Sequence, residues 1–377
     1  MLIVGIIVGL IVLVVLVAAH ELGHAIVAKR NGVVVEEFGI GFPPRAWKKK
    51  LKNGVLFTLN WLPLGGFVKL QGEHDAANKK GDYGAATFWQ KTKILYAGVV
   101  VNWLIAVVLL SILAVTGLPK IIPNQFSVPS DTTTISSPVQ IGVITKGYPA
   151  EKAGLQKGDK IVSLAGESID NSAEMIDVSK QHRGEVVVVV FERGGQQKTA
   201  EVSLRDADAA VFGATLGQRE SIKATWSAPI VGIVTTGQYT WVTIQGLGQL
   251  VTDFFGGLLG QLSTSEEGRE AATEKLDRAG ESVAGPVGIL GVIFPAASEA
   301  GFSQVIFLAA IISLTLAVMN ALPIPSLDGG RWFVTALFKV MKKPLTKDLE
   351  EKIHGTGFMV LLGLILLVTI ADVFKLF

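Results

Sequence analysis

An unbroken run of apolar residues, 2–19, opens this chain and restricts it to folds that contain a membrane-sized helix. A transmembrane helix needs about 20 predominantly apolar residues, so the run and one further turn can cross a bilayer. A cleaved signal peptide is the alternative. No basic residue precedes the run, however, and His-Glu-Leu-Gly-His follows at 20–24 in place of a small-residue cleavage site. We therefore predict a retained transmembrane helix.

Three further segments are apolar enough to span a membrane: 94–118, 305–322 and 358–374. The composition agrees, because 49% of the residues are hydrophobic and only 18% are charged, below the usual proportion of charged residues in soluble domains. Cysteine is absent, which excludes disulfides, thiolate zinc sites and iron–sulfur clusters. The formal net charge of +2 gives no sign of a nucleic-acid partner. We predict a polytopic α-helical membrane protein with about four transmembrane helices.

Charges between these segments predict the orientation. Residues 29–93 hold 12 Lys and Arg against 5 Asp and Glu, and residues 331–354 hold 6 against 3. Residues 118–303 hold 15 against 21. Because cytoplasmic loops carry an excess of Lys and Arg, we expect the two basic loops in the cytoplasm and both termini on the other side.

The long middle segment contains a soluble module between residues 141 and 204. Strand-like runs at 141–144 and 186–191 enclose a small-residue turn and a helix, and Glu-Arg-Gly-Gly-Gln at 192–196 is typical of a hairpin turn. The pattern resembles a PDZ domain. We therefore expect a linker and an inserted, extracytoplasmic α+β PDZ-like domain over residues 119–210.

The remaining residues complete the domain division. Residues 224–262 are apolar but rich in Gly, Thr and Gln, which favours an interfacial or partly buried helix pair over a span. We assign 211–303 to this amphipathic, interfacial region. The first membrane part is 1–118, with a membrane-associated β-hairpin in its loop 55–70, and the second membrane part is 304–377.

His20 and His24 are the clearest candidate metal ligands. They lie four residues apart, so on a helix both imidazoles project from one face and can share an ion. Zinc suits neutral imidazole, and the adjacent Glu21 could take a proton from water activated by the ion. Ionisable groups at the end of an apolar span are costly, so we interpret the cluster as functional. The alternative is a group of side chains that snorkels to the interface.

A catalytic zinc site usually has three protein ligands, so a third ligand must come from elsewhere. Asp328 is the candidate, because it follows the third span in a segment that two prolines interrupt. The alternative for Asp328 is a helix N-cap, since a glycine pair and a helical pattern follow it. The other histidines, His74, His182 and His354, are not expected at a matching depth.

The number of membrane crossings tests this ligand set. The first and third spans must run in the same direction for Asp328 to reach the depth of the histidines. The middle segment must therefore cross the membrane an even number of times. A single crossing by residues 224–262 would separate the ligands, which is the main reason for predicting that this region is interfacial.

With these residues identified, the chain resembles the site-2 protease family of intramembrane zinc metalloproteases, most closely the bacterial branch that includes the regulator of sigma-E protease. The resemblance covers nearly the whole chain. It rests on six elements in one order: His-Glu-Leu-Gly-His at 20–24, Gly-Ile-Gly-Phe-Pro-Pro-Arg at 39–45, Pro-Leu-Gly-Gly-Phe-Val-Lys-Leu at 63–70, Tyr-Ala-Gly-Val-Val-Val-Asn-Trp at 96–103, Gly-Pro-Val-Gly-Ile at 285–289, and the Asn-to-Gly segment 320–330.

The resemblance implies zinc held by His20, His24 and Asp328, with Glu21 activating water to attack a peptide bond inside the membrane. It also implies that an asparagine and a loop hold the substrate extended, since a transmembrane helix must unwind before its peptide bonds can be cut. The alternatives are a plain membrane-skirting hairpin for the loop and a helix-packing hydrogen bond for Asn102. The candidate substrate-binding residues are Asn320, Gly65, Gly66, Phe67, Val68 and Asn102.

The function implied is a zinc endopeptidase of regulated intramembrane proteolysis, cutting transmembrane segments of single-span proteins such as anti-sigma factors or remnant signal peptides. We expect it in a bacterial inner membrane, with its active site near the cytoplasmic side. An upstream site-1 type protease is an expected partner on the same substrate. The competing hypotheses are a membrane-embedded metal transporter or sensor and an inactive PDZ scaffold.

The PDZ-like domain has two possible roles. It could bind a C-terminal carboxylate by strand addition, or it could be a size filter that blocks bulky extracellular domains until another protease has trimmed them. We expect the filter.

Overall fold

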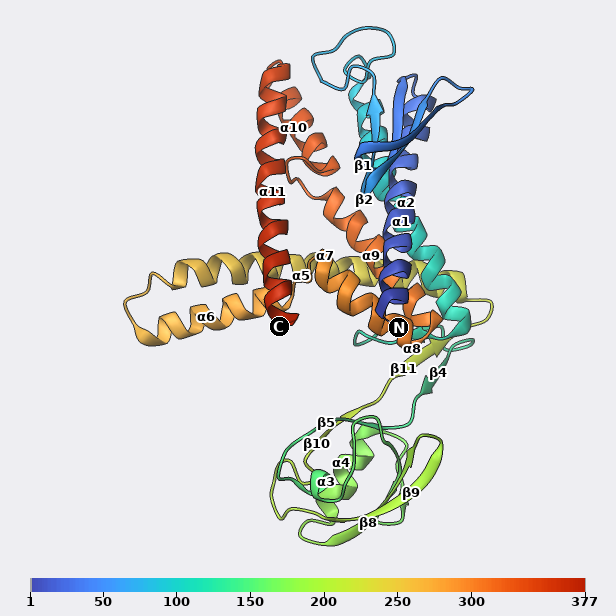
Figure 1. The fold of residues 1–377 in the computed structure, drawn as a ribbon, viewed down its shortest axis with the longest axis vertical. Coiled ribbons are helices and arrows are strands. Elements are labelled where there is room, and N and C mark those ends of the chain that lie inside the picture. Colours follow the sequence, from blue (N-terminus) through green and yellow to red (C-terminus); the bar gives the residue numbers. More distant parts are fainter. Residues whose placement is uncertain (1, 377) are drawn as a thin grey trace. The chain divides into compact units, whose positions relative to one another are not determined.

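The computed structural model describes residues 2–376 (Figure 1). They form two compact units. The inserted unit is Ala114–Ala228, and the membrane unit combines Met1–Leu113 with Pro229–Phe377.

Four helices of the membrane unit are long and apolar enough to cross a membrane: α1 (Leu2–Arg30), α2 (Phe88–Thr116), α9 (Phe302–Ala321) and α11 (Lys347–Leu376). Among the described residues, a fifth span is possible only if the bent pair Glu266–Glu281 and Pro286–Ala300 counts as one. The helices match the four predicted runs, and α1 continues past residue 19 to Arg30. The His-Glu-Leu-Gly-His segment therefore belongs to the first helix.

A second set of helices connects the inserted unit to α9. It comprises α5 (Ala228–Gly260), α6 (Glu266–Glu281), α7 (Pro286–Gly288), the π-helix η1 (Ile289–Ile293) and α8 (Phe294–Ala300). The predicted helix pair at 224–262 is wrong in detail, because α5 is one helix of 33 residues. Its partner is α6, which runs beside it and crosses the direction of α11 (Figure 1). Asp253 and Arg278 join the two helices, with 3.7 Å between Oδ1 and Nη2.

A twisted antiparallel sheet of β1 (Val35–Lys50) and β2 (Leu56–Leu70) follows α1. Residues 37–40 of β1 pair with both ends of β2, with residues 56–59 on one side and 66–69 on the other. The buried Glu37 carboxylate fixes this fold, accepting hydrogen bonds from Arg45 Nη2 at 2.7 Å and Thr58 Oγ1 at 2.9 Å. Residues 66–70 are consequently an edge of the sheet.

The inserted unit is built around a six-stranded sheet with the order β10-β5-β6-β8-β9, in which β7 pairs with β6. Its strands are β5 (Gln140–Ile144), β6 (Lys160–Leu164), β7 (Glu167–Ser168), β8 (Val186–Arg193), β9 (Gln196–Ser203) and β10 (Ala214–Gly217). Two helices, α3 (Pro149–Lys152) and α4 (Ser172–Gln181), accompany the sheet. Alternate residues of β8 are buried, as expected for a strand with one face on a core.

The inserted unit is larger than the predicted 119–210. β10 pairs with β5, so residues beyond 210 complete the main sheet. The predicted linker also contains strand β4 (Thr133–Ser136), which pairs with β11 (Glu220–Lys223), itself paired with β3 (Leu118–Pro119). The proline-rich composition of this stretch hid these pairings, since short edge strands have little sequence signal of their own.

Two carboxylates, the buried Asp159 and the half-buried Asp131, hold the inserted unit together. Desolvation raises the pKa of Asp159, but hydrogen bonds from Arg193 at 2.7 Å outweigh it and leave the pKa below its ordinary value. Desolvation likewise opposes ionisation of Asp131. Hydrogen bonds from the hydroxyl and backbone N–H groups of Ser227 and Thr225 nevertheless hold the pKa of that carboxyl well below its usual range. Asp131 thus joins the segment after β3 to the segment after β11.

Candidate metal centre

Two ligand candidates lie on one face of α1, near its C-terminal end. His20 and His24 are separated by one turn, both are buried, and their Nε2 atoms are 3.1 Å apart. Two unprotonated imidazole nitrogens repel each other at this distance. The contact is favourable if one nitrogen donates a proton to the other, or if both bind the same cation. Their geometry suits two lone pairs directed at one ion.

Asp328 is brought to these histidines by a sharp reversal after α9. The chain leaves α9 at Ala321 and starts α10 (Asp328–Val340) at the aspartate. Two glycines make this reversal possible, because a Cβ at Gly329 would be 2.3 Å from the Ala321 carbonyl oxygen and one at Gly330 would be 1.9 Å from that of Ile324. The N-cap alternative for Asp328 is wrong, since Leu327 occupies that position and no side chain caps the helix.

The three side chains have the spacing of a zinc site. Asp328 Oδ2 lies 3.1 Å from His20 Nε2 and 3.3 Å from His24 Nε2. Ligands placed tetrahedrally at Zn–N distances of 2.0–2.1 Å would be about 3.3 Å from one another. Among the described residues, this is the one group of three or more His, Asp or Glu side chains close enough to hold a metal. The structure therefore brings together all three ligands that the sequence predicts.

Each histidine is oriented through its second ring nitrogen. His24 Nδ1 lies 2.7 Å from the carbonyl oxygen of Ile94 on α2. A carbonyl can only accept, so Nδ1 carries the proton and Nε2 is free to bind a metal. His20 Nδ1 lies 3.3 Å from the side-chain amide of Asn102, also on α2.

Asn102 does not occupy a position from which it could contact a substrate. Its side chain is fully buried, and its Oδ1 has no hydrogen-bond partner. Oxygen and nitrogen of an amide are assigned from their surroundings, and turning this amide would let Oδ1 accept from His20 Nδ1–H. That arrangement satisfies the orphaned oxygen and leaves His20 Nε2 free for a metal. The predicted substrate contact is corrected to a zinc-ligand contact.

Gly98 makes room for the metal centre and was not singled out from the sequence. A Cβ at this position would lie 2.5 Å from His24 Nε2 and 2.6 Å from His20 Nε2. The available signal was a glycine inside an apolar span, where it lowers helix propensity and commonly has a packing or functional reason.

Glu21 lies between the histidines and the sheet. It is part of the same helical turn, and a Cβ at Gly66 of β2 would be 3.4 Å from its Cγ. The edge of the sheet, residues 66–70, therefore passes beside the predicted general base. Gly65, Phe67 and Val68 continue this edge, with Gly65 at a φ of 111° where its neighbour Phe42 leaves no room for a Cβ.

Asn320 sits in the last turn of α9, where its Nδ2 donates to the carbonyl of Leu316 at 3.0 Å. This bond uses one donor and leaves its side-chain oxygen available as an acceptor. Its predicted contact with a substrate stays a prediction.

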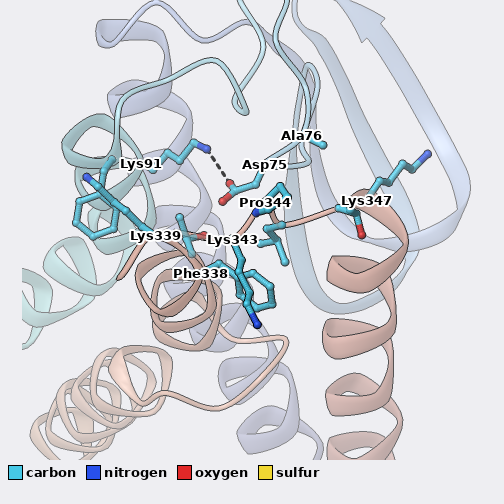
Figure 2. Close-up of a pocket in the computed structure, with 12 residues that line it drawn as sticks. Asp75, Ala76, Lys91, Phe338, Lys339, Lys343, Pro344 and Lys347 are labelled. Carbon is cyan, nitrogen blue, oxygen red and sulfur yellow. Dashed lines mark hydrogen bonds and ion pairs between the residues drawn. The ribbon is translucent and has the colours of Figure 1, made fainter. Parts of the chain in front are cut away.

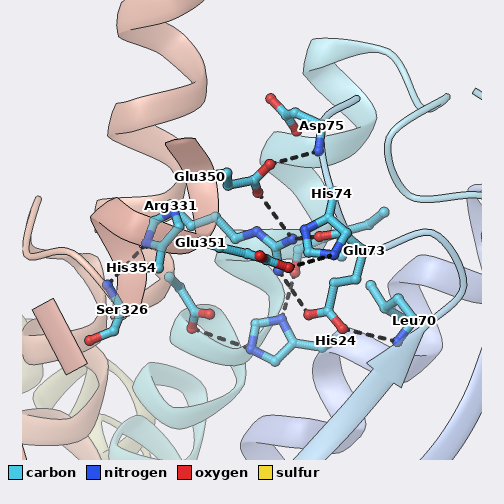
Figure 3. Close-up of polar contacts among 12 residues, drawn as sticks. His24, Leu70, Glu73, His74, Asp75, Ser326, Arg331, Glu350, Glu351 and His354 are labelled. Carbon is cyan, nitrogen blue, oxygen red and sulfur yellow. Dashed lines mark hydrogen bonds and ion pairs between the residues drawn. The ribbon is translucent and has the colours of Figure 1, made fainter. Parts of the chain in front are cut away.

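A cavity of about 800 Å³ reaches Asp328, and its lining includes the loop after β2 and the first turns of α10 and α11. Figure 3 shows Arg331, one turn after Asp328, extending between Glu73 and Glu350. Its Nη1 donates to Glu73 at 2.8 Å, and Nη2 lies 3.5 Å from Glu350. Arg331 thereby ties the start of α10 both to the loop after β2 and to α11.

Two further histidines line this cavity. His354 Nδ1 accepts from the backbone N–H of Ser326 at 3.2 Å, and His74 Nε2 lies 3.7 Å from Glu351 (Figure 3). Neither joins the three-ligand cluster. This agrees with the expectation that no other histidine completes the ligand set. His354 lies near the reversal that precedes α10 because α11 begins well before its apolar run.

Comparison with known proteins identifies the family. The sequence pattern described as Peptidase family M50 matches residues 8–364. The chain belongs to this family. Its members are zinc-dependent, so this M50 peptidase is a zinc-dependent metalloendopeptidase, and the resemblance to site-2 proteases is confirmed.

Named relatives of this M50 peptidase cover almost its whole length. Zinc metalloprotease RasP from Geobacillus kaustophilus (strain HTA426) is 28% identical over 445 residues, covering 96% of this chain and 96% of the relative. A putative zinc metalloprotease from Helicobacter pylori (strain J99) is 30% identical, covering 94% and 95%. A solved PDZ domain of the SdrC-like protein Lmo2051 from Listeria monocytogenes is 25% identical, covers 21% of this chain and 86% of that chain, and has a TM-score of 0.19. The apolar helices and the bacterial relatives indicate a bacterial membrane protein.

Replacing Asn102 with leucine in this M50 peptidase should weaken zinc binding by about 10–100-fold, the usual effect of removing a group that orients a metal ligand. Leucine has a similar volume but cannot accept from His20 Nδ1–H. Competition with a fluorescent zinc chelator measures the affinity, with Asn78→Leu in an exposed loop as the control. Unchanged zinc affinity would show that Asn102 only packs helices.

Proposed function

We propose that this M50 peptidase cuts peptide bonds within transmembrane segments of single-span membrane proteins. Zinc would be held by His20, His24 and Asp328, with Glu21 as the general base. The observation that carries this proposal is the place of the ligands: two are buried in α1 and the third follows α9, both helices long and apolar enough to span a membrane. An enzyme of soluble substrates has no need of a metal centre at that depth.

A few side chains would share the steps of peptide-bond hydrolysis. Held by His20, His24 and Asp328, zinc would supply Lewis-acid polarisation of the scissile carbonyl and of the attacking water. Glu21 takes the proton from the attacking water and passes it to the leaving amine. Asn102 and the Ile94 carbonyl hold the two imidazoles in the tautomer that binds metal, and Arg331 keeps the start of α10 in place.

Substrate binding would use the edge of β2. A helical substrate satisfies its own backbone hydrogen bonds, so cutting it requires an alternative partner for each freed group. Residues 66–70 are paired with β1 on one side only, and this edge passes Glu21. An unwound substrate could add to it as a further strand, with Gly65, Gly66, Phe67 and Val68 in contact and Asn320 binding a freed N–H.

The proposed location is a bacterial inner membrane, with both termini extracytoplasmic and the active site near the cytoplasmic side. The helix directions support an even number of crossings by the segment between α2 and α9, because α1 and α9 both point their C-terminal ends toward the metal centre (Figure 1). Lys29 and Arg30 end α1 at that side, as the positive-inside rule requires.

The inserted unit would act as a size filter, so that an upstream site-1 type protease must shorten the substrate first. Anti-sigma factors and remnant signal peptides are substrates of this kind. The filter is supported by the unit's own compact core, which gives it bulk independent of the membrane helices. Because β10 pairs with β5 alone among the described strands, strand addition of a peptide at β10 is the alternative role.

The test uses purified enzyme in proteoliposomes with single-span substrates that carry either a short or a bulky outer domain. We expect fragments whose new ends map within the apolar segment, loss of cleavage with a zinc chelator, and recovery on adding zinc. Cleavage only in soluble loops would contradict the proposal. Zinc uptake by the vesicles without any cleavage would instead support the transporter hypothesis.

A further inference from the structure

A cavity separate from the metal centre lies where α2 and α11 begin (Figure 2). It has a volume of about 580 Å³ and shares no lining residue with the cavity that reaches Asp328. The start of α2, the second half of α10 and the segment 343–347 form its walls. No step of the proposed mechanism uses it.

The cavity is strongly basic. Lys91, Lys339, Lys343 and Lys347 line it, against the single carboxylate of Asp75. Lys91 is buried and bound to Asp75 at 2.8 Å, and the Lys339 ammonium lies 4.2 Å from the centre of the Phe88 ring. Lys347 is paired with Glu351, with 3.7 Å between Nζ and Oε1. Among the described residues, Lys339 and Lys343 have no carboxylate partner, and these two charges favour an anionic ligand.

A buried hydroxyl in the wall lacks a partner. Thr335 is only 8% exposed, and its Oγ1 has no hydrogen-bond partner. An unsatisfied buried hydroxyl costs free energy, so such a group commonly serves a ligand that supplies the missing acceptor. The first turn of the 30-residue helix α11, at Thr346 and Lys347, adds backbone N–H groups and a positive dipole end.

The position of the cavity indicates which anion reaches it. Both α2 and α11 are candidate spans and both start here, so the cavity lies at the end of the apolar region. Trp89, next to Phe88, is 71% exposed, as expected for an aromatic residue in the headgroup layer. Phe88, Phe338 and Leu345 give the cavity apolar walls.

We propose that this cavity binds the phosphate of an anionic phospholipid headgroup. Lys343, Lys347 and the first turn of α11 contact the phosphate, Thr335 donates to one of its oxygens, and the apolar walls accommodate the glycerol and first methylenes. Basic pockets between membrane helices are a known solution for such headgroups. A soluble phosphate offers the same charge but cannot use the apolar walls.

The test measures lipids retained by the full-length protein. Wild type is extracted from nanodiscs containing equal parts of phosphatidylglycerol and phosphatidylcholine, and native mass spectrometry counts the bound lipids. The Lys343→Gln/Lys347→Gln variant should retain on the order of tenfold less phosphatidylglycerol, with little change in phosphatidylcholine. Its fold should be intact, because a lysine in the first turn of a helix opposes the dipole.

Two further variants and one competitor complete the design. Thr335→Val should also lose phosphatidylglycerol, and its thermal stability without lipid should not fall, since it removes an unsatisfied hydroxyl. Lys49→Gln/Lys50→Gln, at exposed positions of β1, removes equal charge elsewhere and should keep the lipid. The proposal is wrong if this control loses the lipid equally, if wild type shows no preference for phosphatidylglycerol, or if millimolar inorganic phosphate displaces the lipid completely.

Discussion

Replacing Glu21 with glutamine should reduce cleavage of a transmembrane substrate by about 10²–10⁴-fold while leaving zinc bound. The change preserves shape and removes only the ability to take a proton from water. His20, His24 and Asp328 are untouched, so the metal content should equal that of the wild type. Single-turnover cleavage in proteoliposomes, with zinc measured by atomic emission on the same sample, separates the two effects.

A matched control is Glu201→Gln on the exposed strand β9, which makes the same chemical change away from the membrane unit. It should cleave at the wild-type rate. If Glu21→Gln lost zinc as well as activity, Glu21 would be holding the metal centre together and its role as general base would be refuted.

Replacing Gly98 with alanine should remove most of the zinc and nearly all of the activity. The added methyl would lie 2.5 Å from His24 Nε2 and 2.6 Å from His20 Nε2, where a metal-binding imidazole has no room to retreat between two packed helices. Alanine otherwise favours helices over glycine by about 1 kcal/mol, so α2 itself should not be weakened. We expect less than about a tenth of the wild-type zinc at equal protein, comparable to the loss of a group that orients a metal ligand.

Gly363→Ala is the control for this variant. It makes the same substitution in another candidate span, α11, and a Cβ there meets nothing within 4 Å. It should retain full zinc and activity. If Gly98→Ala bound as much zinc as the wild type, α2 would be able to shift relative to α1. The close contact of Gly98 with the two histidines would then not be required for zinc binding.

The candidate metal ligands could be recognised in the sequence because their chemistry is local. His20 and His24 need only a helix to share one face, and Asp328 stands in a proline-interrupted segment that suits a reversal inside a membrane. The four apolar runs likewise depend on length and composition alone. These local signals combine into one arrangement because Asp328 reaches the histidines only if α1 and α9 run in the same direction.

Other parts depend on tertiary contacts that leave little trace in sequence. In the sequence, an asparagine that binds a substrate cannot be told from one that orients a histidine. The burial of Asn102 and its contact with the His20 ring distinguish these two roles. Residues 37–40 gave no sign that they pair with both ends of β2. The strand at 214–217 is too short to be recognised before its partner, β5, is known to lie beside it. These features follow from which segments meet, not from local propensity.

The separation of the proposed ligands along the chain gives the enzyme a delayed onset. His20 and Asp328 are 308 residues apart, so a ribosome adding 5–20 residues per second makes the last ligand about 15–60 s after the first. Until α9 has inserted and the glycine pair after Asp328 has formed its reversal, α1 offers two imidazoles and no carboxylate to a metal. A partly synthesised chain therefore passes the translocation machinery and its other clients without a competent protease in its first helix.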